Sequence, residues 1–159
     1  MAQDDAFFLF ACREKTPAAR EIASRLRAAA ARNELDANFA ILPDMPDIRE
    51  FLHLVDVLVM PLRTLYAKMD IPLVIIEALE AGVPLVIDSA PSPLQEIFRR
   101  EVGVIVRKNK GETLSGGIAS LLIDRNFAVR CSENARLVYR EMFTAERMAA
   151  EVEEFYQLL

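Results

Sequence analysis

The chain has 159 residues, of which 53% are hydrophobic and 27% charged, and its net charge is −5. This mixture is typical of one globular domain large enough to bury a core, and the acidic balance argues against a nucleic-acid-binding protein. No apolar run approaches the roughly 20 residues of a membrane span. The acidic residues 1–5 lack the basic flank of a signal peptide, and Cys12 and Cys131 lack metal-ligand spacing. We therefore expect a cytoplasmic protein with two reduced, structural thiols.

The first half of the chain alternates apolar strands with helices. Residues 6–12 (AFFLFAC) form a continuous apolar run, which predicts a buried strand. Thr16 and Pro17 predict the N-cap and first residue of a helix, and Asn33 is a plausible end. The predicted buried face of this helix consists of Ile22, Leu26, Ala29 and Ala30. A second strand, a short helix and a third strand follow, over residues 38–42, up to about 54, and over 57–60.

The second half continues the same alternation and then becomes helical. A helix that carries Glu77, a strand, a helix and a fifth strand are predicted, the last three over residues 84–87, 94–99 and 103–106. Three helices end the chain, near residues 112–123, 126–138 and 144–158, with Thr144 as the cap of the last one. Gly116 and Gly117 fall inside the first of these helices, and we interpret them as a close-packing site.

Short strands that alternate with helices predict βαβ units and a parallel sheet. The fold class is therefore α/β, with a doubly wound, Rossmann-like parallel sheet. We see no internal linker, so residues 1–159 are expected to form a single domain. In such a sheet, ligands bind beyond the carboxyl ends of the strands.

Glu77 is the most informative residue, because it interrupts the apolar run 73–79 of a predicted helix. An unpaired carboxylate buried there would cost several kcal/mol. Two interpretations stay open on spacing alone. The helix reaches solvent at this point, with Glu80 one turn further on the same side, or a ligand supplies hydroxyl groups to the carboxylate.

The wider string resembles the group 1 family of retaining, nucleotide-sugar-dependent glycosyltransferases. In that family a strand ending in proline, a polar loop, a helix ending Glu-Ala-x-x-x-Gly-x-Pro and another strand follow one another. Here Pro61, a loop through Asp70 and the run Glu77-Ala78-Leu79-Glu80-Ala81-Gly82-Val83-Pro84 fit this order. The resemblance extends from about Ala6 to the C-terminus. It covers only the second, nucleotide-binding half of such GT-B-fold enzymes.

The resemblance also implies site residues. Glu77 would accept hydrogen bonds from the ribose hydroxyls of the nucleotide. The base would be read through backbone groups around Leu42 and Met45, and Ser89 and Glu96 would lie near the donor. Arg63 and Lys68 flank the motif and could meet the diphosphate, although a solvated loop surface explains these cations equally well.

Three departures from the family pattern weaken the resemblance. The first glutamate of the family's pair is replaced by Met69; Asp70 beside it could substitute, but the N-cap of the Glu77 helix is its favoured role. Where the family has Gly-Gly after the fourth strand, this chain has the segment 88–93, which contains no glycine. The family's Arg/Lys pair that holds the diphosphate would precede the first strand seen here. We therefore expect this chain alone to be inactive and to bind a nucleoside diphosphate weakly.

Two functional hypotheses follow from this pattern. The first is the donor-binding half of an enzyme that transfers a hexose from a nucleoside-diphosphate sugar with retention. It would use no metal and no cofactor, and would work with an N-terminal acceptor-binding domain or partner chain, with membrane association of a full-length enzyme as a further option. The alternative is a stand-alone α/β binding or interaction module that kept the fold without catalysis. No feature of the sequence identifies the base, the sugar or the acceptor.

The last predicted helix carries an apolar stripe, which consists of Met148, Val152, Phe155 and Leu159. An exposed patch of this kind is disfavoured in a soluble monomer. We expect the helix either to fold back onto the other helices of the domain, which is the favoured alternative, or to associate with a second copy.

Overall fold

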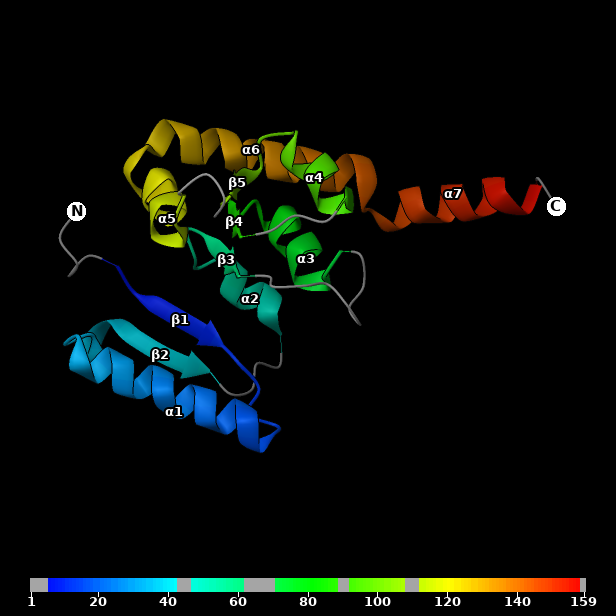
Figure 1. Cartoon of the computed structure of the whole chain (residues 1–159). Coiled ribbons are helices and arrows are strands. Elements are labelled where there is room, and N and C mark those ends of the chain that lie inside the picture. Colours follow the sequence, from blue (N-terminus) through cyan, green and yellow to red (C-terminus); the bar gives the residue numbers. More distant parts are fainter. Residues whose placement is uncertain (1–5, 43–46, 62–70, 89–91, 108–111, 158–159) are drawn as a thin grey trace. The chain divides into compact units, whose positions relative to one another are not determined.

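The computed structural model describes residues 6–42, 47–61, 71–88, 92–107 and 112–157. The chain divides into two compact units, Met1–Asp47 and Ile48–Leu159. Figure 1 shows the elements of each unit along the chain. The single domain over residues 1–159 stays a prediction.

The first unit is a βαβ unit with two parallel strands. Strand β1 (Phe8–Ala11) pairs with β2 (Phe39–Leu42), and the Phe10 and Phe39 rings lie 5.2 Å apart. Between them run α1 (Pro17–Arg32) and the 3₁₀ helix η2 (Asp36–Asn38). The Ala19 amide donates to Thr16 Oγ1 at 3.1 Å, and α1 ends at Asn33. The predicted helix start and end are therefore confirmed.

The predicted buried face of α1 is partly wrong. The helix buries Ala23 and Ala30, which lie seven residues apart and share a face, whereas Ile22 is 57% exposed. Small alanine side chains allow a helix to approach its neighbours closely. The sequence pattern included Ala30 correctly, but it selected Ile22 and missed Ala23, so α1 is rotated relative to the predicted face.

The second unit contains a three-stranded parallel sheet in the order β3-β4-β5. Its strands are β3 (Leu58–Met60), β4 (Leu85–Ile87) and β5 (Gly103–Ile105). Every residue of the central strand β4 is buried. Leu85 and Ile87 belong to one apolar cluster and Val86 to another, because alternate side chains of a strand point to opposite faces.

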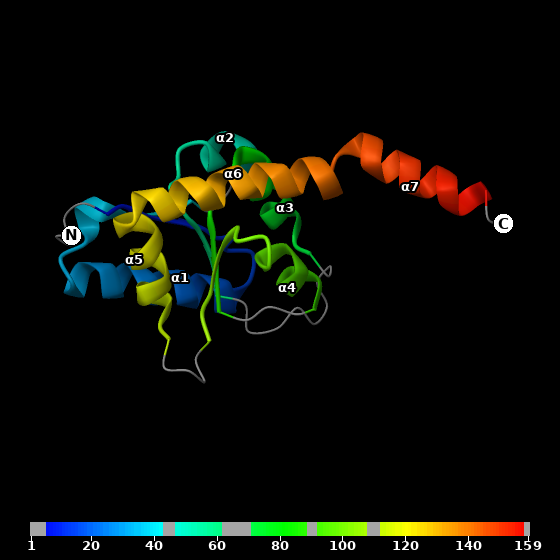
Figure 2. The ribbon, with the colours of Figure 1, turned by 90° about the horizontal axis from the view of Figure 1, so that it is seen from above.

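Helices pack against the sheet of this unit from both faces. The unit contains α2 (Ile48–Leu52), α3 (Leu73–Ala81), α4 (Ser92–Phe98), α5 (Leu114–Ile123), α6 (Arg125–Met142) and α7 (Ala145–Gln157). Residues of α3, α4 and α6 share the cluster of Leu85 and Ile87, whereas α5 contributes Leu121 to the cluster of Val86. Figures 1 and 2 both show α6 running past α3. The predicted α/β class with a parallel, doubly wound arrangement is confirmed.

The glycine pair in α5 occupies the kind of site that the sequence predicts. Gly117 is buried, and a Cβ atom there would lie 2.9 Å from Val106 Cγ2 and 3.1 Å from Val86 Cγ1. The exposed Gly116 would meet only Thr113 Oγ1, at 3.1 Å. Gly117 is therefore the close-packing residue of the pair.

Helix α7 does not fold back onto the other helices, so the favoured expectation for the apolar stripe is wrong. Every residue of α7 is exposed, with exposed fractions of 66% for Met148, 48% for Val152 and 61% for Phe155. In Figures 1 and 2, α7 continues outward from the end of α6. The stripe member Leu159 lies outside the described residues. The predicted cap is present, because the Arg147 amide donates to Thr144 Oγ1 at 3.2 Å.

Candidate functional site

The carboxyl ends of β3, β4 and β5 meet at one edge of the sheet in the second unit. Met60, Ile87 and Ile105 are the last strand residues, and they stand in register across the sheet. The half-buried Asp88 follows β4, and Arg107 follows β5. Because ligands of open parallel sheets bind beyond this edge, it is the candidate functional site of the second unit.

The structure describes only some of the predicted site residues. Leu42, Glu77 and Glu96 are described, whereas Met45, Arg63, Lys68, Asp70 and Ser89 lie outside the described residues. The proposed diphosphate contacts of Arg63 and Lys68 therefore stay predictions.

Glu77 occupies the fifth position of α3, on a helix that is otherwise deeply packed. Its neighbours Ile75, Ala78 and Leu79 are fully buried, whereas Glu77 itself is half-buried. Helix α3 follows the last residues of β3 along the chain and ends before β4, so it connects two strands of the candidate edge. The carboxylate is thus neither sealed in the core nor fully solvated.

The two ends of α3 differ in how their polar groups are satisfied. The N-cap position is Pro72, without a side-chain cap hydrogen bond. This corrects the expectation of an Asp70 cap, because the helix begins two residues after the expected position. At the other end, Gly82 adopts a left-handed conformation with φ 74°, and its amide bonds to carbonyl groups of the last turn.

Glu80 lies one turn beyond Glu77 and is exposed, as the solvent-facing interpretation of this helix expects. Its Oε1 atom accepts a hydrogen bond of 3.0 Å from the Tyr139 hydroxyl group on α6. The pKa of Tyr139 is raised above its ordinary value, first by desolvation and then by the hydrogen bond to Glu80. The sequence pattern gave no sign of this contact, because 59 residues separate its partners.

The other two described candidates lie on other elements than Glu77. Glu96 is exposed on α4 and forms an ion pair with Arg99 of the same helix. Leu42 ends β2 in the first unit, where its carbonyl group accepts a hydrogen bond of 3.1 Å from the Cys12 amide. Their proposed roles toward a donor nucleotide stay predictions.

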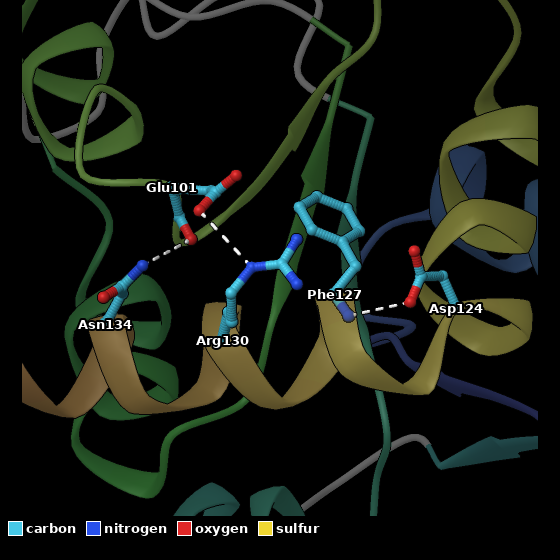
Figure 3. A network of polar contacts seen from close by, with 5 residues as sticks. All are labelled: Glu101, Asp124, Phe127, Arg130 and Asn134. Atoms are coloured by element: carbon cyan, nitrogen blue, oxygen red, sulfur yellow. Dashed lines mark hydrogen bonds and ion pairs between the residues drawn. The ribbon is translucent and has the colours of Figure 1, made fainter.

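A second polar network lies at the opposite, amino end of β5 (Figure 3). Glu101 adopts φ 55°, and its carbonyl group accepts a 3.4 Å hydrogen bond from Asn134 of α6. Arg130 Nε lies 3.9 Å from Glu101 Oε2, and its guanidinium group lies 5.6 Å from the centre of the Phe127 ring. Asp124 caps α6 through a 2.9 Å hydrogen bond from the Phe127 amide. This network fixes the turn into β5 and lies away from the candidate edge.

Among the residues described, no three His, Cys, Asp or Glu side chains are grouped so that they could hold a metal ion. None of the described helices is both long enough and apolar enough to cross a membrane. Of the two cysteines, Cys131 is buried, whereas Cys12 is exposed, which corrects the expectation of two structural thiols.

Comparison with solved structures supports the fold. The sucrose-phosphate synthase of Thermosynechococcus elongatus matches with a TM-score of 0.73 and 18% identity, over 94% of this chain and 37% of the other. The Anabaena protein HepE, solved in complex with UDP and glucose, matches with a TM-score of 0.69 and 16% identity, over 96% and 40%. Both are GT-B proteins, so the predicted GT-B-type half is confirmed as a fold.

Sequence comparison gives the family. A GDP-mannose-dependent α-(1-6)-phosphatidylinositol monomannoside mannosyltransferase of Mycobacterium tuberculosis is 30% identical over 105 residues, in each of two strains. The match covers 64% of this chain and 27% of those relatives, so the chain spans about a quarter of their length. Residues 21–138, which include Glu77 and all of α3, match the family described as glycosyl transferases group 1. The chain therefore belongs to the group 1 glycosyltransferase family.

Proposed function

We propose that the chain is the donor-binding half of a retaining, metal-independent glycosyltransferase that uses a nucleoside-diphosphate hexose. Family membership and the resemblance of the motif around Glu77 support this proposal. It is also supported by the mycobacterial relative, which is named for its dependence on GDP-mannose, and by HepE, which was solved with UDP and glucose. The acceptor would be bound by an N-terminal domain or a partner chain.

The half-buried Glu77 carboxylate is the observation that carries the proposal. A carboxylate has two acceptor oxygens, which match two vicinal hydroxyl groups of a ribose. Partial burial strengthens such charge-assisted hydrogen bonds, because less water competes for the oxygens. Tight packing of Ile75, Ala78 and Leu79 holds α3 in place and so restricts where the carboxylate can move.

The protein would contribute positioning and charge neutralisation to the transfer. A donor held by its ribose and diphosphate presents its anomeric carbon to the acceptor in one geometry. Cations such as Arg63 and Lys68 would stabilise the diphosphate as negative charge develops on the leaving group. Retention of configuration follows the pattern of the resembled family.

A second candidate, a binding module without catalysis, is favoured by specific sequence features. Met69 stands where the family has its first glutamate, and residues 88–93 contain no glycine where the family has two. Both changes fall on positions that lie near the transferred sugar in the resembled family, whereas neither affects Glu77. Nucleotide binding without sugar transfer is therefore the outcome expected from this alternative.

The ribose contact can be tested by comparing ribonucleotides with 2′-deoxyribonucleotides. We expect the chain to bind UDP, GDP or ADP only weakly, near millimolar, and to prefer the ribonucleotide over its 2′-deoxy form by about tenfold, as a lost charge-assisted hydrogen bond implies. The substitution Glu77→Gln should remove most of this preference. Chemical-shift titration by NMR measures dissociation constants in this range.

Glu133→Gln provides a matched control, because Glu133 is an exposed glutamate on α6 in the same unit. It should leave the ribose preference unchanged, and both variants should stay folded. If Glu77→Gln unfolds the domain, or if the ribose preference survives the substitution, Glu77 is a structural residue and the proposal is wrong.

A further inference from the structure

Two residues of α6 hold the C-terminal end of the helix that carries Glu77. Arg136 Nη2 donates a 2.9 Å hydrogen bond to the Ala81 carbonyl group, and its Nη1 donates at 2.9 Å to Ser132 Oγ, one turn earlier on α6. The Ala81 carbonyl is among the last four of α3, which have no partner within the helix. A cation at this position also interacts favourably with the helix dipole. Arg136 therefore caps α3 from another helix, across 55 residues of sequence.

Gly82 leaves the space that this cap needs. A Cβ atom on Gly82 would lie 2.4 Å from Arg136 Cζ and 2.6 Å from its Nε, which is closer than any real contact. The left-handed φ of 74° is also a conformation that residues with a side chain rarely adopt. Glycine at this position therefore serves both the helix end and the guanidinium group.

Tyr139 adds a second polar contact one turn further along α6. Its hydroxyl group bonds to Glu80 at 3.0 Å, as described above. Beside these polar side chains on α6, Ala135 and Val138 are fully buried in the same cluster as Ala78 and Leu79 of α3. The two helices thus touch through an apolar strip that two hydrogen-bonded side chains border.

We propose that Arg136 and Tyr139 are positioning residues, which set the rotation and axial position of α3 and thereby the location of the Glu77 carboxylate. This inference rests on the proposed role of Glu77 toward a nucleotide ribose. Pro72 at the N-terminal end of α3 provides no side-chain cap. The contacts of Arg136 and Tyr139 lie at the C-terminal end of the helix, at Ala81 and Glu80. Glu77 lies one turn before that end.

Geometry indicates how sensitive the ribose contact would be to this arrangement. Side-chain tips lie about 5–6 Å from a helix axis, so a 20° rotation of α3 would move the carboxylate by about 2 Å. A displacement of about 1 Å in a binding group can already change a rate or affinity strongly. A hydrogen bond also weakens steeply when its distance or angle departs from the optimum.

The test compares how the chain discriminates ribose from deoxyribose when each contact is removed. We expect Arg136→Met and Tyr139→Phe to reduce the ribonucleotide preference at least threefold while the protein stays folded. Arg136→Lys retains the positive charge and a hydrogen-bond donor, so it should keep more of the ribonucleotide preference than Arg136→Met does. Arg140→Met, at an exposed arginine one turn further along α6, is the control and should change nothing.

A second route perturbs the same contact from the α3 side. Gly82→Ala should displace the guanidinium group and reduce the ribose preference, and combining it with Arg136→Met should give less than the product of the two effects, because both remove one contact. Arg136→Met should also have no further effect on the preference in the Glu77→Gln background. NMR titration with ribonucleotide and deoxyribonucleotide, on samples whose fold is checked by their spectra, provides every value.

The outcomes separate this inference from the proposed function. If the wild-type chain shows no ribose preference, or Glu77→Gln does not reduce it, both are wrong. If Glu77→Gln acts as expected but Arg136→Met and Tyr139→Phe lower only stability and keep the full preference, the contacts are structural and the positioning role alone is wrong. A merely structural contact would alter the melting temperature without changing the ratio of the two affinities.

Discussion

At the scale of single residues, residues of the same type differ in burial and in their contacts, and the sequence alone does not predict these differences. Glu77 and Glu80 both interrupt an apolar helix, but Glu77 is half-buried, whereas Glu80 is exposed and engaged by Tyr139. The two cysteines differ in the same way. Cys131 is fully buried in the cluster of Val86, Val106 and Leu121, and burial is the main cause that raises its pKa from 9.0 to about 11. Glu101 raises this pKa further, and Arg130 partly offsets the shift.

The shifted thiol predicts two measurable differences. Because only the thiolate reacts, Cys12 should react with a thiol reagent in the native chain at pH 8, and Cys131 only after unfolding. The free energy of unfolding should also fall between about pH 9 and 11. In that window the native state retains a proton that the unfolded state loses, so the contribution, on the order of 2 kcal/mol, is complete below pH 9 and lost as pH rises to 11.

Cys131→Ala is the variant that checks the origin of this pH dependence. It should flatten the fall in stability above pH 9, although a residual slope is expected from Tyr139, whose pKa is raised in the same direction. Equal reaction rates of both thiols in the native chain would contradict the prediction. Denaturant unfolding at several pH values, with a thiol titration, provides both measurements.

At the scale of elements, local signals in the sequence were sufficient for most helices and strands. Thr16 and Thr144 cap their helices as predicted, and the apolar runs mark all five strands to within one or two residues. Local signals could not give the rotation of α1, because it depends on how closely Ala23 and Ala30 approach their neighbours. They also could not give the Arg136 cap, which joins residues far apart in the chain.

The candidate site shows the same division between local and distant information. The Glu77 motif is a local pattern, so the sequence was enough to select this residue and its family. The contact between Tyr139 and Glu80, in contrast, depends on how α6 crosses α3, and no spacing within either helix encodes it. Arg63, Lys68 and Ser89 lie outside the described residues, so their predicted contacts with a donor stay predictions.

The two glycines of α5 give a prediction at this scale. Gly117→Ala should destabilise the domain by about 1–3 kcal/mol, because its methyl group would press on Val106 and Val86, which lie within the core. Gly116→Ala should be neutral or stabilising by up to about 1 kcal/mol, since alanine has the higher helix propensity and only Thr113 Oγ1 is close. Denaturant unfolding of both variants measures the difference, and equal effects would mean that α5 does not pack on the sheet as described.

At the scale of the whole molecule, apolar burial is divided unevenly. Both apolar clusters lie entirely in the second unit, whereas the described part of the first unit buries only Ala23 and Ala30 fully among its apolar residues. Most of the hydrophobic stabilisation therefore comes from the second unit, which also contains Glu77 and both residues that hold α3. The alternation of strands and helices predicted the fold class, but such a pattern contains no measure of how much each unit buries.

Helix α7 gives the last prediction, because its exposure implies that it adds little to stability. An isolated helix of 13 residues is marginal in water, and the ion pair between Arg147 and Glu151, at 2.8 Å, adds only about 0.3–0.5 kcal/mol. Backbone amides of α7 should therefore exchange with deuterium much faster than those of α6, which contributes Ala135 and Val138 to the core.

Removal of residues 144–159 should change the free energy of unfolding by less than about 1 kcal/mol. Leu137→Ala, at a surface position of α6, controls for the loss of an exposed apolar side chain. Slow exchange in α7, or a loss of more than about 2 kcal/mol on truncation, would mean that the apolar stripe is covered in solution.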